Sequence, residues 1–263
     1  MIDWGEEFCS QLASHGYWTI RFDNRDVGLS TKLDDLGTPD IRAMLTARND
    51  GQPVQSPYSL SQMSDDTVGL LDFTEIDSAH VIGLSMGGEI AQLMAIHHPK
   101  RLLSLTSIMS STAEPVLPRP TPEASALLTD PAPPEREDYI EYRLAHRRVL
   151  CGPGFPFDEK FAREHAGRRF DRGLHPDGFA RQLAAILASE GRKEALTSVT
   201  IPTLVIHGDR DPLVPVACGI DTADAIPGAE LRIIEGMGHD WPPSLLLTLI
   251  DTIVDHISKA QIP

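Results

Sequence analysis

The feature that most constrains the fold is the run AHVIGLSMGGEIA at residues 79–91. Its apolar part, Val81–Leu84, predicts a buried strand. The segment Gly83–Gly87 matches the G-x-S-x-G pattern, in which a strained strand-to-helix turn lifts a serine hydroxyl above the end of a sheet. Strand and helix backbones approach closely at such a turn, so a Cβ at Gly83 or Gly87 is expected to collide. Glycine-rich turns of parallel α/β proteins also produce this pattern, so its meaning depends on partners elsewhere in the chain.

Length and composition exclude several classes of protein. With 263 residues, the chain can bury a large core as one domain, or as one domain with an insertion. Its net charge of −15 argues against nucleic acid and anionic membranes as partners. We see no run of membrane-spanning length and no secretory signal pattern. The three cysteines are far apart and contain no C-x-x-C pair, which favours a reducing, cytoplasmic location.

Strand patterns and helix patterns alternate along much of the chain. Strands are predicted at Tyr17–Phe22, Val81–Leu84, Leu102–Met109, Pro202–His207 and Ala229–Ile234. Helices are predicted at Ile2–His15, Ser64–Phe73, Met86–His98, Val216–Ala225 and Leu245–Ser258. The proline-containing stretch Gly37–Tyr58 is expected to be irregular. This alternation predicts an α/β fold with a mostly parallel sheet flanked by helices.

The character of the sequence changes in the middle of the chain. Seven prolines between residues 115 and 134 mark a linker, and helices are predicted at Asp138–Leu150, Asp158–Arg169 and Asp177–Ser189. Residues 112–196 contain 13 basic and 14 acidic residues, whereas the remainder is strongly acidic. The basic residues are mostly arginines, which could attract an acidic substrate. Solvated helix faces paired with nearby acids are the simpler interpretation.

Two later residues supply what a nucleophilic serine needs. A serine hydroxyl is a poor nucleophile unless a base takes its proton, and the base needs an orienting acid. Asp211 follows the predicted strand at 202–207, and His239 follows the strand at 229–234. Asp209 is a rival for the role of the acid. The carboxyl ends of parallel strands meet at one edge of a sheet, so we expect Ser85, an aspartate and His239 to lie together.

Four segments together resemble the α/β-hydrolase superfamily: Arg21–Ser30, Gly83–Gly87, Pro202–Pro215 and Gly236–His239. The order Ser85, Asp211, His239 is also that of the superfamily. The branch most similar is that of cap-bearing serine esterases related to aclacinomycin methylesterase.

This resemblance implies an α/β-hydrolase core at residues 1–111 and 197–263, with a helical cap at 112–196 inserted into it. It also implies that Ser85 is the nucleophile, His239 the proton carrier and Asp211 the orienting acid. Asp211 is favoured over Asp209 because it matches the family's G-x-x-D loop. The triad needs no cofactor and no metal, and the sequence has no metal-spaced motif.

One part of the family pattern is missing. The backbone N–H of Met86 is the expected first donor of an oxyanion hole, but the family's second donor comes from a loop after an earlier strand. This chain opens in the helix that normally follows that loop, so it resembles an N-terminally truncated member and the second donor is not identifiable. In the family, the absent strand lies between Tyr17–Phe22 and the strand before Ser85. We therefore expect these two strands to pair directly, or another segment or chain to fill the gap in a homo-oligomer.

The leading functional hypothesis is a serine carboxylesterase that hydrolyses small to medium carboxylic esters through an acyl-enzyme on Ser85. Alternatives with the same triad are a carbon–carbon bond hydrolase of ring-cleavage products and a cofactor-free perhydrolase. A non-enzymatic alternative is an inactive binding or assembly module.

Several other residues have two interpretations. Asp23, Arg25 and Asp26 could touch substrate, but a structural role in their loop is favoured. His207 and the pair His97 and His98 are interpreted as structural. Trp241 and Met237 could line a pocket or belong to the core. Candidates for an apolar pocket in the cap are Leu144, Val149, Leu150, Phe155, Phe157, Leu183 and Ile186.

Overall fold

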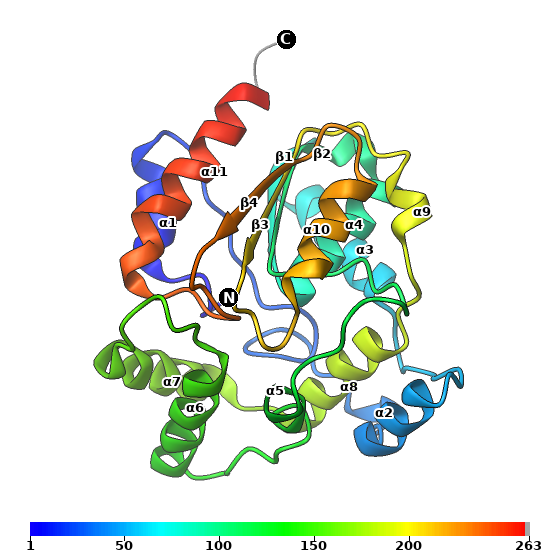
Figure 1. Cartoon of the computed structure of the whole chain (residues 1–263), viewed down its shortest axis with the longest axis vertical. Coiled ribbons are helices and arrows are strands. Elements are labelled where there is room, and N and C mark those ends of the chain that lie inside the picture. Colours follow the sequence, from blue (N-terminus) through cyan, green and yellow to red (C-terminus); the bar gives the residue numbers. More distant parts are fainter. Residues whose placement is uncertain (261–263) are drawn as a thin grey trace. The chain divides into compact units, whose positions relative to one another are not determined.

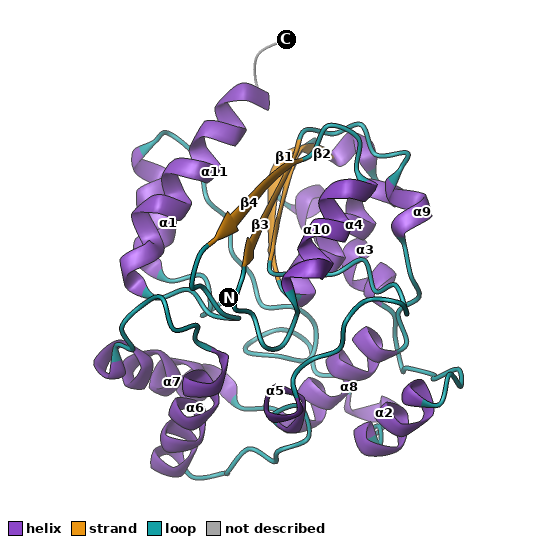
Figure 2. Cartoon of the chain, in the orientation of Figure 1, coloured by secondary structure: helices purple, strands orange, loops and turns teal. Residues whose placement is uncertain are grey.

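The computed structural model describes residues 1–260 and divides the chain into two compact units. The first, here the helical unit, consists of residues 1–59, 122–149 and 156–189. The second, here the sheet unit, consists of residues 60–121, residues 150–155 and the chain from Glu190 onward. Figures 1 and 2 show the elements of each unit.

The sheet unit is built on four parallel strands. In spatial order they are β1 (Ala79–Leu84), β2 (Leu102–Ile108), β3 (Thr203–Gly208) and β4 (Glu230–Ile234). The register pairs Leu84 with Ile108, and Gly208 with Ile234, so the strands end at a common edge. Every residue of β3 is buried, as expected for a parallel strand that is covered on both faces.

Helices cover both faces of this sheet. Figure 1 shows α11 on one face and α3, α4 and α10 on the other. The bounds are α3 Leu60–Phe73, α4 Met86–His97, α9 Lys193–Leu196, α10 Val216–Ala225 and α11 Leu246–Ala260, with short 3₁₀ turns η2 at Pro99–Arg101 and η3 at Pro243–Leu245. A core that includes Leu71, Met94, Leu105, Leu196 and Ile226 lies between the sheet and the helices. Each such side chain contributes about 1.5–3 kcal/mol by its burial.

The helical unit contains α1 (Glu6–Ser14), η1 (Asp34–Leu36), α2 (Ile41–Asn49), α5 (Pro122–Ala126), α6 (Arg136–Leu150), α7 (Glu159–Gly173) and α8 (Pro176–Leu187). Aspartates begin two of these helices. The Asp40 side chain accepts the N–H of Ala43 at the start of α2, and Asp158 accepts the N–H of Phe161 at the start of α7. Helices α6 and α7 share a small apolar cluster of Ile140, Leu144, Ala162 and Ala166, against which Phe157 packs.

Three sequence predictions about secondary structure are wrong. Residues 17–22 form no strand, and Trp18 in this segment is 79 % exposed. The stretch Gly37–Tyr58 contains α2, and α3 starts at Leu60, so Ser64 lies inside a helix instead of capping one. A strand needs a neighbour to receive its backbone hydrogen bonds, and the Tyr17–Phe22 segment has no such neighbour among residues 1–260.

Among residues 1–260, no strand fills the gap that the sequence predicts beside the strand before Ser85. Strand β1 is an edge strand, and no strand of the described residues lies on its outer side. The direct pairing expected between Tyr17–Phe22 and the strand before Ser85 is therefore wrong. Filling of the gap by another chain stays a prediction.

The predicted boundaries of a cap at residues 112–196 also stay a prediction. The helical unit contains residues 1–59 together with much of the predicted cap.

Within residues 1–260, none of the helices combines the length and the apolar character that crossing a membrane requires.

Candidate active site

Ser85 lies on a tight turn between β1 and α4. Its backbone has φ 52° and ψ −118°, a conformation that non-glycine residues rarely adopt. Its N–H donates to the carbonyl of Ile108 at 2.9 Å, and its own carbonyl accepts the N–H of Gly88 at 2.8 Å. These bonds hold the strained turn in place from both sides.

The glycines around Ser85 have unequal roles. A Cβ on Gly83 would lie 2.1 Å from the carbonyl oxygen of Gly87, so the strand and the helix backbone require glycine there. A Cβ on Gly87 would meet nothing within 4 Å, and the collision expected at this position is wrong. Gly88 is the second crowded position, since a Cβ there would lie 2.6 Å from the Cβ of Ser110.

The structure brings Ser85, His239 and Asp211 together in the sheet unit. The Nε2 atom of His239 lies 2.9 Å from the Oγ of Ser85, and its Nδ1 atom lies 2.7 Å from Oδ2 of Asp211. Each residue follows the carboxyl end of a strand: β1 for Ser85, β3 for Asp211 and β4 for His239. Asp209 makes a different contact, because its Oδ1 accepts the N–H of Gly236 at 2.6 Å.

The Asp211 carboxylate is buried and is surrounded by donors. Its Oδ1 accepts the N–H groups of Leu213 at 2.9 Å and Val214 at 2.7 Å. Burial by itself raises the pKa of Asp211, but the nearby His239 and its hydrogen bond, the close His207 ring and the N–H of Val214 lower it to about 2. Asp211 is therefore an anion at neutral pH, which suits it to orient an imidazole.

The segment at residues 150–155, between α6 and α7, supports the loop of His239. The carbonyl of Leu150 accepts the N–H of His239 at 2.8 Å, and the N–H of Gly154 donates to the carbonyl of Gly236 at 3.0 Å. A Cβ on Gly152 would lie 2.1 Å from that same carbonyl oxygen. The alternating glycines of Cys151–Phe155 were the available signal, because such glycines often mark a close approach of two backbones.

A buried polar network lies behind the turn. Glu89, in the first turn of α4, receives a hydrogen bond from Arg192 at 2.8 Å. The same guanidinium donates to the side chain of Gln92 at 3.1 Å and to the carbonyl of Ser111 at 2.8 Å.

Met86 is the first residue of α4, so its N–H has no acceptor inside the helix and is available near Ser85.

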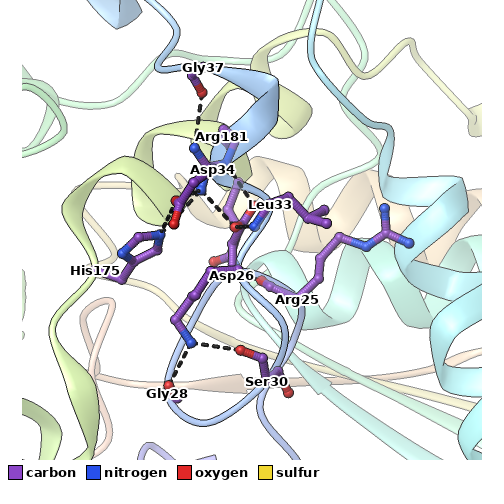
Figure 3. Close-up of polar contacts among 11 residues, drawn as sticks. Arg25, Asp26, Gly28, Ser30, Leu33, Asp34, Gly37, His175 and Arg181 are labelled. Atoms are coloured by element: carbon purple, nitrogen blue, oxygen red, sulfur yellow. Dashed lines mark hydrogen bonds and ion pairs between the residues drawn. The ribbon is translucent and has the colours of Figure 1, made fainter.

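Asp23, Arg25 and Asp26 lie in a loop of the helical unit. Figure 3 shows Arg25 and Asp26 in this loop. Both Asp26 and Arg181 of α8 are buried, and the guanidinium donates to the two carboxylate oxygens at 2.7 and 2.9 Å. Arg181 also donates to the carbonyl of Gly37 at 2.9 Å and to Asp34 at 3.0 Å. Burial raises the pKa of Asp26, but the bonds from Arg181 and from the N–H of Leu33 lower it to about 2.

Neighbouring residues complete this loop. Asp23 accepts hydrogen bonds from Arg172 at 2.7 Å and from the N–H of Leu29 at 3.0 Å. The guanidinium of Arg25 lies 5.0 Å from the centre of the Tyr58 ring. The carboxylates of Asp23 and Asp26 are thus engaged by groups of the protein itself, which favours the structural interpretation over substrate contact.

The remaining pocket candidates are either buried or partly buried. Met237 is fully buried, and Leu144 and Leu183 are buried in the helical unit.

Cys9, Cys151 and Cys218 are free thiols. No group of three or more histidine, cysteine, aspartate or glutamate side chains within residues 1–260 is arranged to hold a metal ion.

Comparison with known proteins defines the class of the chain. The profile of the alpha/beta hydrolase fold family matches residues 3–241. The chain therefore belongs to this family, and its parallel sheet flanked by helices is the fold that the sequence predicted.

Individual relatives are hydrolases. Rhodomycin D methylesterase DauP of Streptomyces sp. (strain C5) is 29 % identical over 98 % of this chain and 87 % of its own length. The 2-hydroxymuconate semialdehyde hydrolase of Pseudomonas sp. (strain CF600) is 28 % identical over 72 % of this chain and 65 % of its own. The structure of esterase EaEST from Exiguobacterium antarcticum matches in fold, with a TM-score of 0.69 at 19 % identity over 96 % of this chain and 86 % of that one. The two curated relatives support a hydrolase, and the solved structure supports the alpha/beta hydrolase fold.

Proposed function

We propose that the chain is a serine carboxylesterase that acts through an acyl-enzyme on Ser85. The observation that carries this proposal is the continuous contact from the Ser85 hydroxyl through His239 to the Asp211 carboxylate, at 2.9 and 2.7 Å. A serine whose hydroxyl contacts an imidazole, itself oriented by a buried anion, is the arrangement that acyl transfer needs.

In the acylation step, Nε2 of His239 takes the hydroxyl proton while the Ser85 oxygen attacks the ester carbonyl carbon. Asp211 accepts the Nδ1–H of His239, which keeps the lone pair of Nε2 directed at the serine. The N–H of Met86 stabilises the negative oxygen of the tetrahedral intermediate. His239 then gives its proton to the departing alkoxide, and the acyl group stays on Ser85.

Deacylation repeats this chemistry with water. His239 takes a proton from a water molecule, whose oxygen attacks the acyl carbon. When the intermediate collapses, the Ser85 oxygen leaves and recovers its proton from His239, and the carboxylic acid is released. No redox partner or cofactor takes part in either step.

We propose small to medium carboxylic esters as the substrate class. The name of DauP, a methylesterase that aligns over 98 % of this chain, supports an ester of a small alcohol. A substrate of this kind leaves as an alcohol that His239 protonates, which fits the mechanism above.

The test compares the wild type with Ser85→Ala on p-nitrophenyl acetate and butyrate. We expect the variant to lose roughly six orders of magnitude in kcat, because no other group replaces the nucleophile. Ser198→Ala is the matched control, since Ser198 is an exposed serine of the sheet unit. Turnover by Ser85→Ala at the wild-type rate would remove Ser85 from the mechanism.

A carbon–carbon bond hydrolase is the second candidate, because the similar protein from Pseudomonas sp. (strain CF600) is named for a semialdehyde substrate of that kind. A panel containing esters, a dienone ring-cleavage product and peroxide distinguishes the esterase from this hydrolase and from a perhydrolase. Labelling by a fluorophosphonate requires an activated serine, so a wild-type chain that fails to react would instead support a non-enzymatic module.

A further inference from the structure

A second histidine lies beside the catalytic acid of the proposed triad. His207, on β3, is completely buried. Its Nε2 atom lies 2.7 Å from the carbonyl oxygen of Val214 and 3.5 Å from Oδ2 of Asp211. Its Nδ1 atom is buried and has no hydrogen-bond partner among residues 1–260. A carbonyl oxygen can only accept, so the hydrogen of the neutral imidazole must lie on Nε2.

This N–H supports the turn that holds the Asp211 carboxylate. Val214 donates its own N–H to Oδ1 of Asp211 at 2.7 Å, and its carbonyl receives the hydrogen bond from His207. The residue that fixes one oxygen of the carboxylate is thus itself fixed by His207. The other oxygen, Oδ2, accepts from His239 at 2.7 Å and faces the positive edge of the His207 ring.

The position of the His207 ring is restricted by its surroundings. A Cβ on Gly219 of α10 would lie 2.3 Å from Nδ1 of His207, so the ring packs directly against the helix backbone. From α10, the thiol of Cys218 also faces this region, and burial raises its pKa to about 11, so it carries no charge at neutral pH. Among residues 1–260, the titratable side chains that act on Asp211 thus include His239, His207 and this neutral thiol.

We propose that His207 is a positioning residue for the Asp211 carboxylate: its Nε2–H locks the 211–214 turn and so presents Oδ2 to His239. This inference rests on the proposed triad and adds a residue outside it. In the absence of the N–H, the carbonyl of Val214 loses its donor, the turn is free to shift, and His239 is held less well. A small displacement of a catalytic group of this kind typically lowers the rate by roughly 10- to 100-fold.

Three variants test the proposal. His207→Phe keeps a ring and removes the N–H, whereas His207→Gln restores an N–H close to the position of Nε2. His256→Phe is the control, because it makes the same change at another buried histidine, on α11. We expect His207→Phe to lower kcat for p-nitrophenyl butyrate roughly 10- to 100-fold with KM within about twofold, His207→Gln to recover most of the loss, and His256→Phe to keep near wild-type kcat.

A second readout does not depend on activity. Because the N–H of His207 favours the ionised form of Asp211, the carboxyl carbon resonance of Asp211 should titrate at higher pH in His207→Phe than in the wild type, and near the wild-type value in His207→Gln. If His207→Phe does not fold, His207→Asn, whose amide is too short to reach Val214, takes its place in both measurements.

The outcomes separate this proposal from the esterase proposal. The role of His207 would be overturned if His207→Phe, or His207→Asn in its place, kept kcat within twofold of the wild type. It would also be overturned if the Asp211 carboxyl carbon titrated at the same pH in that variant as in the wild type. Equal losses in His207→Phe and His207→Gln would also overturn it, because shape and not the N–H would then matter. A wild-type protein that hydrolyses no ester would count against the proposed function, while the titration would still decide the role of His207.

Discussion

Residues of the candidate active site adopt a strained backbone or carry a buried charge, each of which costs free energy locally. Contacts with neighbouring groups stabilise them there. Ser85 occupies a strained backbone conformation, which costs on the order of 1–3 kcal/mol and persists because its neighbours fix it. Asp211 and Asp26 are buried carboxylates that stay ionised because donors surround them. The same residue types therefore serve different purposes, since Asp211 faces an imidazole whereas Asp26 faces a guanidinium of α8.

At this scale the sequence predicted that Ser85, Asp211 and His239 lie together, and the structure places them in contact. The motif around Ser85 is local, so both the turn and the start of α4 follow from it. The choice between Asp211 and Asp209 depended on a family pattern, because both follow β3 and nothing local separates them. The contribution of His207 was missed, since its partner Val214 is identified only when the 211–214 turn is folded.

Asp26 gives a prediction for the pH dependence of stability. Its pKa is about 2 in the folded chain, below the 3.8 of an unperturbed aspartate, so the folded state favours the ionised form. The resulting stabilisation, about 2 kcal/mol, is complete above pH 4 or so and is lost as the pH falls through about 2. Asp26→Asn removes this pH-dependent stabilisation. The difference in unfolding free energy between the wild type and the variant should therefore shrink as the pH falls from 4 to 2.

Urea unfolding of both proteins at pH 6, 4 and 3 measures this difference. Asp35→Asn, a change at an exposed aspartate of the same loop, is the control and should give a small difference at every pH. A wild-type advantage over Asp26→Asn that is independent of pH would show that Asp26 is not held ionised by Arg181.

Helices and strands whose sequence has a strong hydrophobic periodicity were predicted to within a few residues. Segments whose structure depends on residues far away in the chain were not. Helix α4 and strand β2 differ from their predicted bounds by a single residue at the carboxyl end. Residues 17–22 have the composition of a strand but lack a neighbouring strand to pair with. Helix α2 was missed because prolines lie on both sides of a short segment, although Asp40 supplies a standard N-cap signal.

Helix α4 depends on the buried ion pair between Glu89 and Arg192. We expect Arg192→Met to lower the free energy of unfolding by roughly 3–5 kcal/mol, because it leaves Glu89 buried without its cation. Urea denaturation measures the change. Adding Glu89→Gln to this variant removes the stranded charge and should recover part of the loss, whereas Arg232→Met, at an exposed arginine of β4, should cost little. A loss below about 1 kcal/mol in Arg192→Met would contradict this role for the pair.

At the scale of the whole molecule, the sheet has unsatisfied edges. Within residues 1–260, β1 has no strand on its outer side, so alternate N–H and C=O groups of the strand before Ser85 lack a partner in the sheet. Large apolar side chains are also exposed, among them Trp18 and Phe73. Exposed strand edges and apolar side chains favour association with another chain.

We therefore propose that the protein forms a homo-oligomer in solution in which β1 is covered. Sedimentation velocity or light scattering should give a mass that is a multiple of one chain, and hydrogen exchange should show slow exchange at the outward N–H groups of β1. Dilution that separates the chains should speed exchange at β1 while leaving β3 slow, because β3 is paired on both sides within one chain. A monomer whose β1 amides exchange rapidly would contradict this proposal, and it would mean that the strand before Ser85 is held by β2 alone.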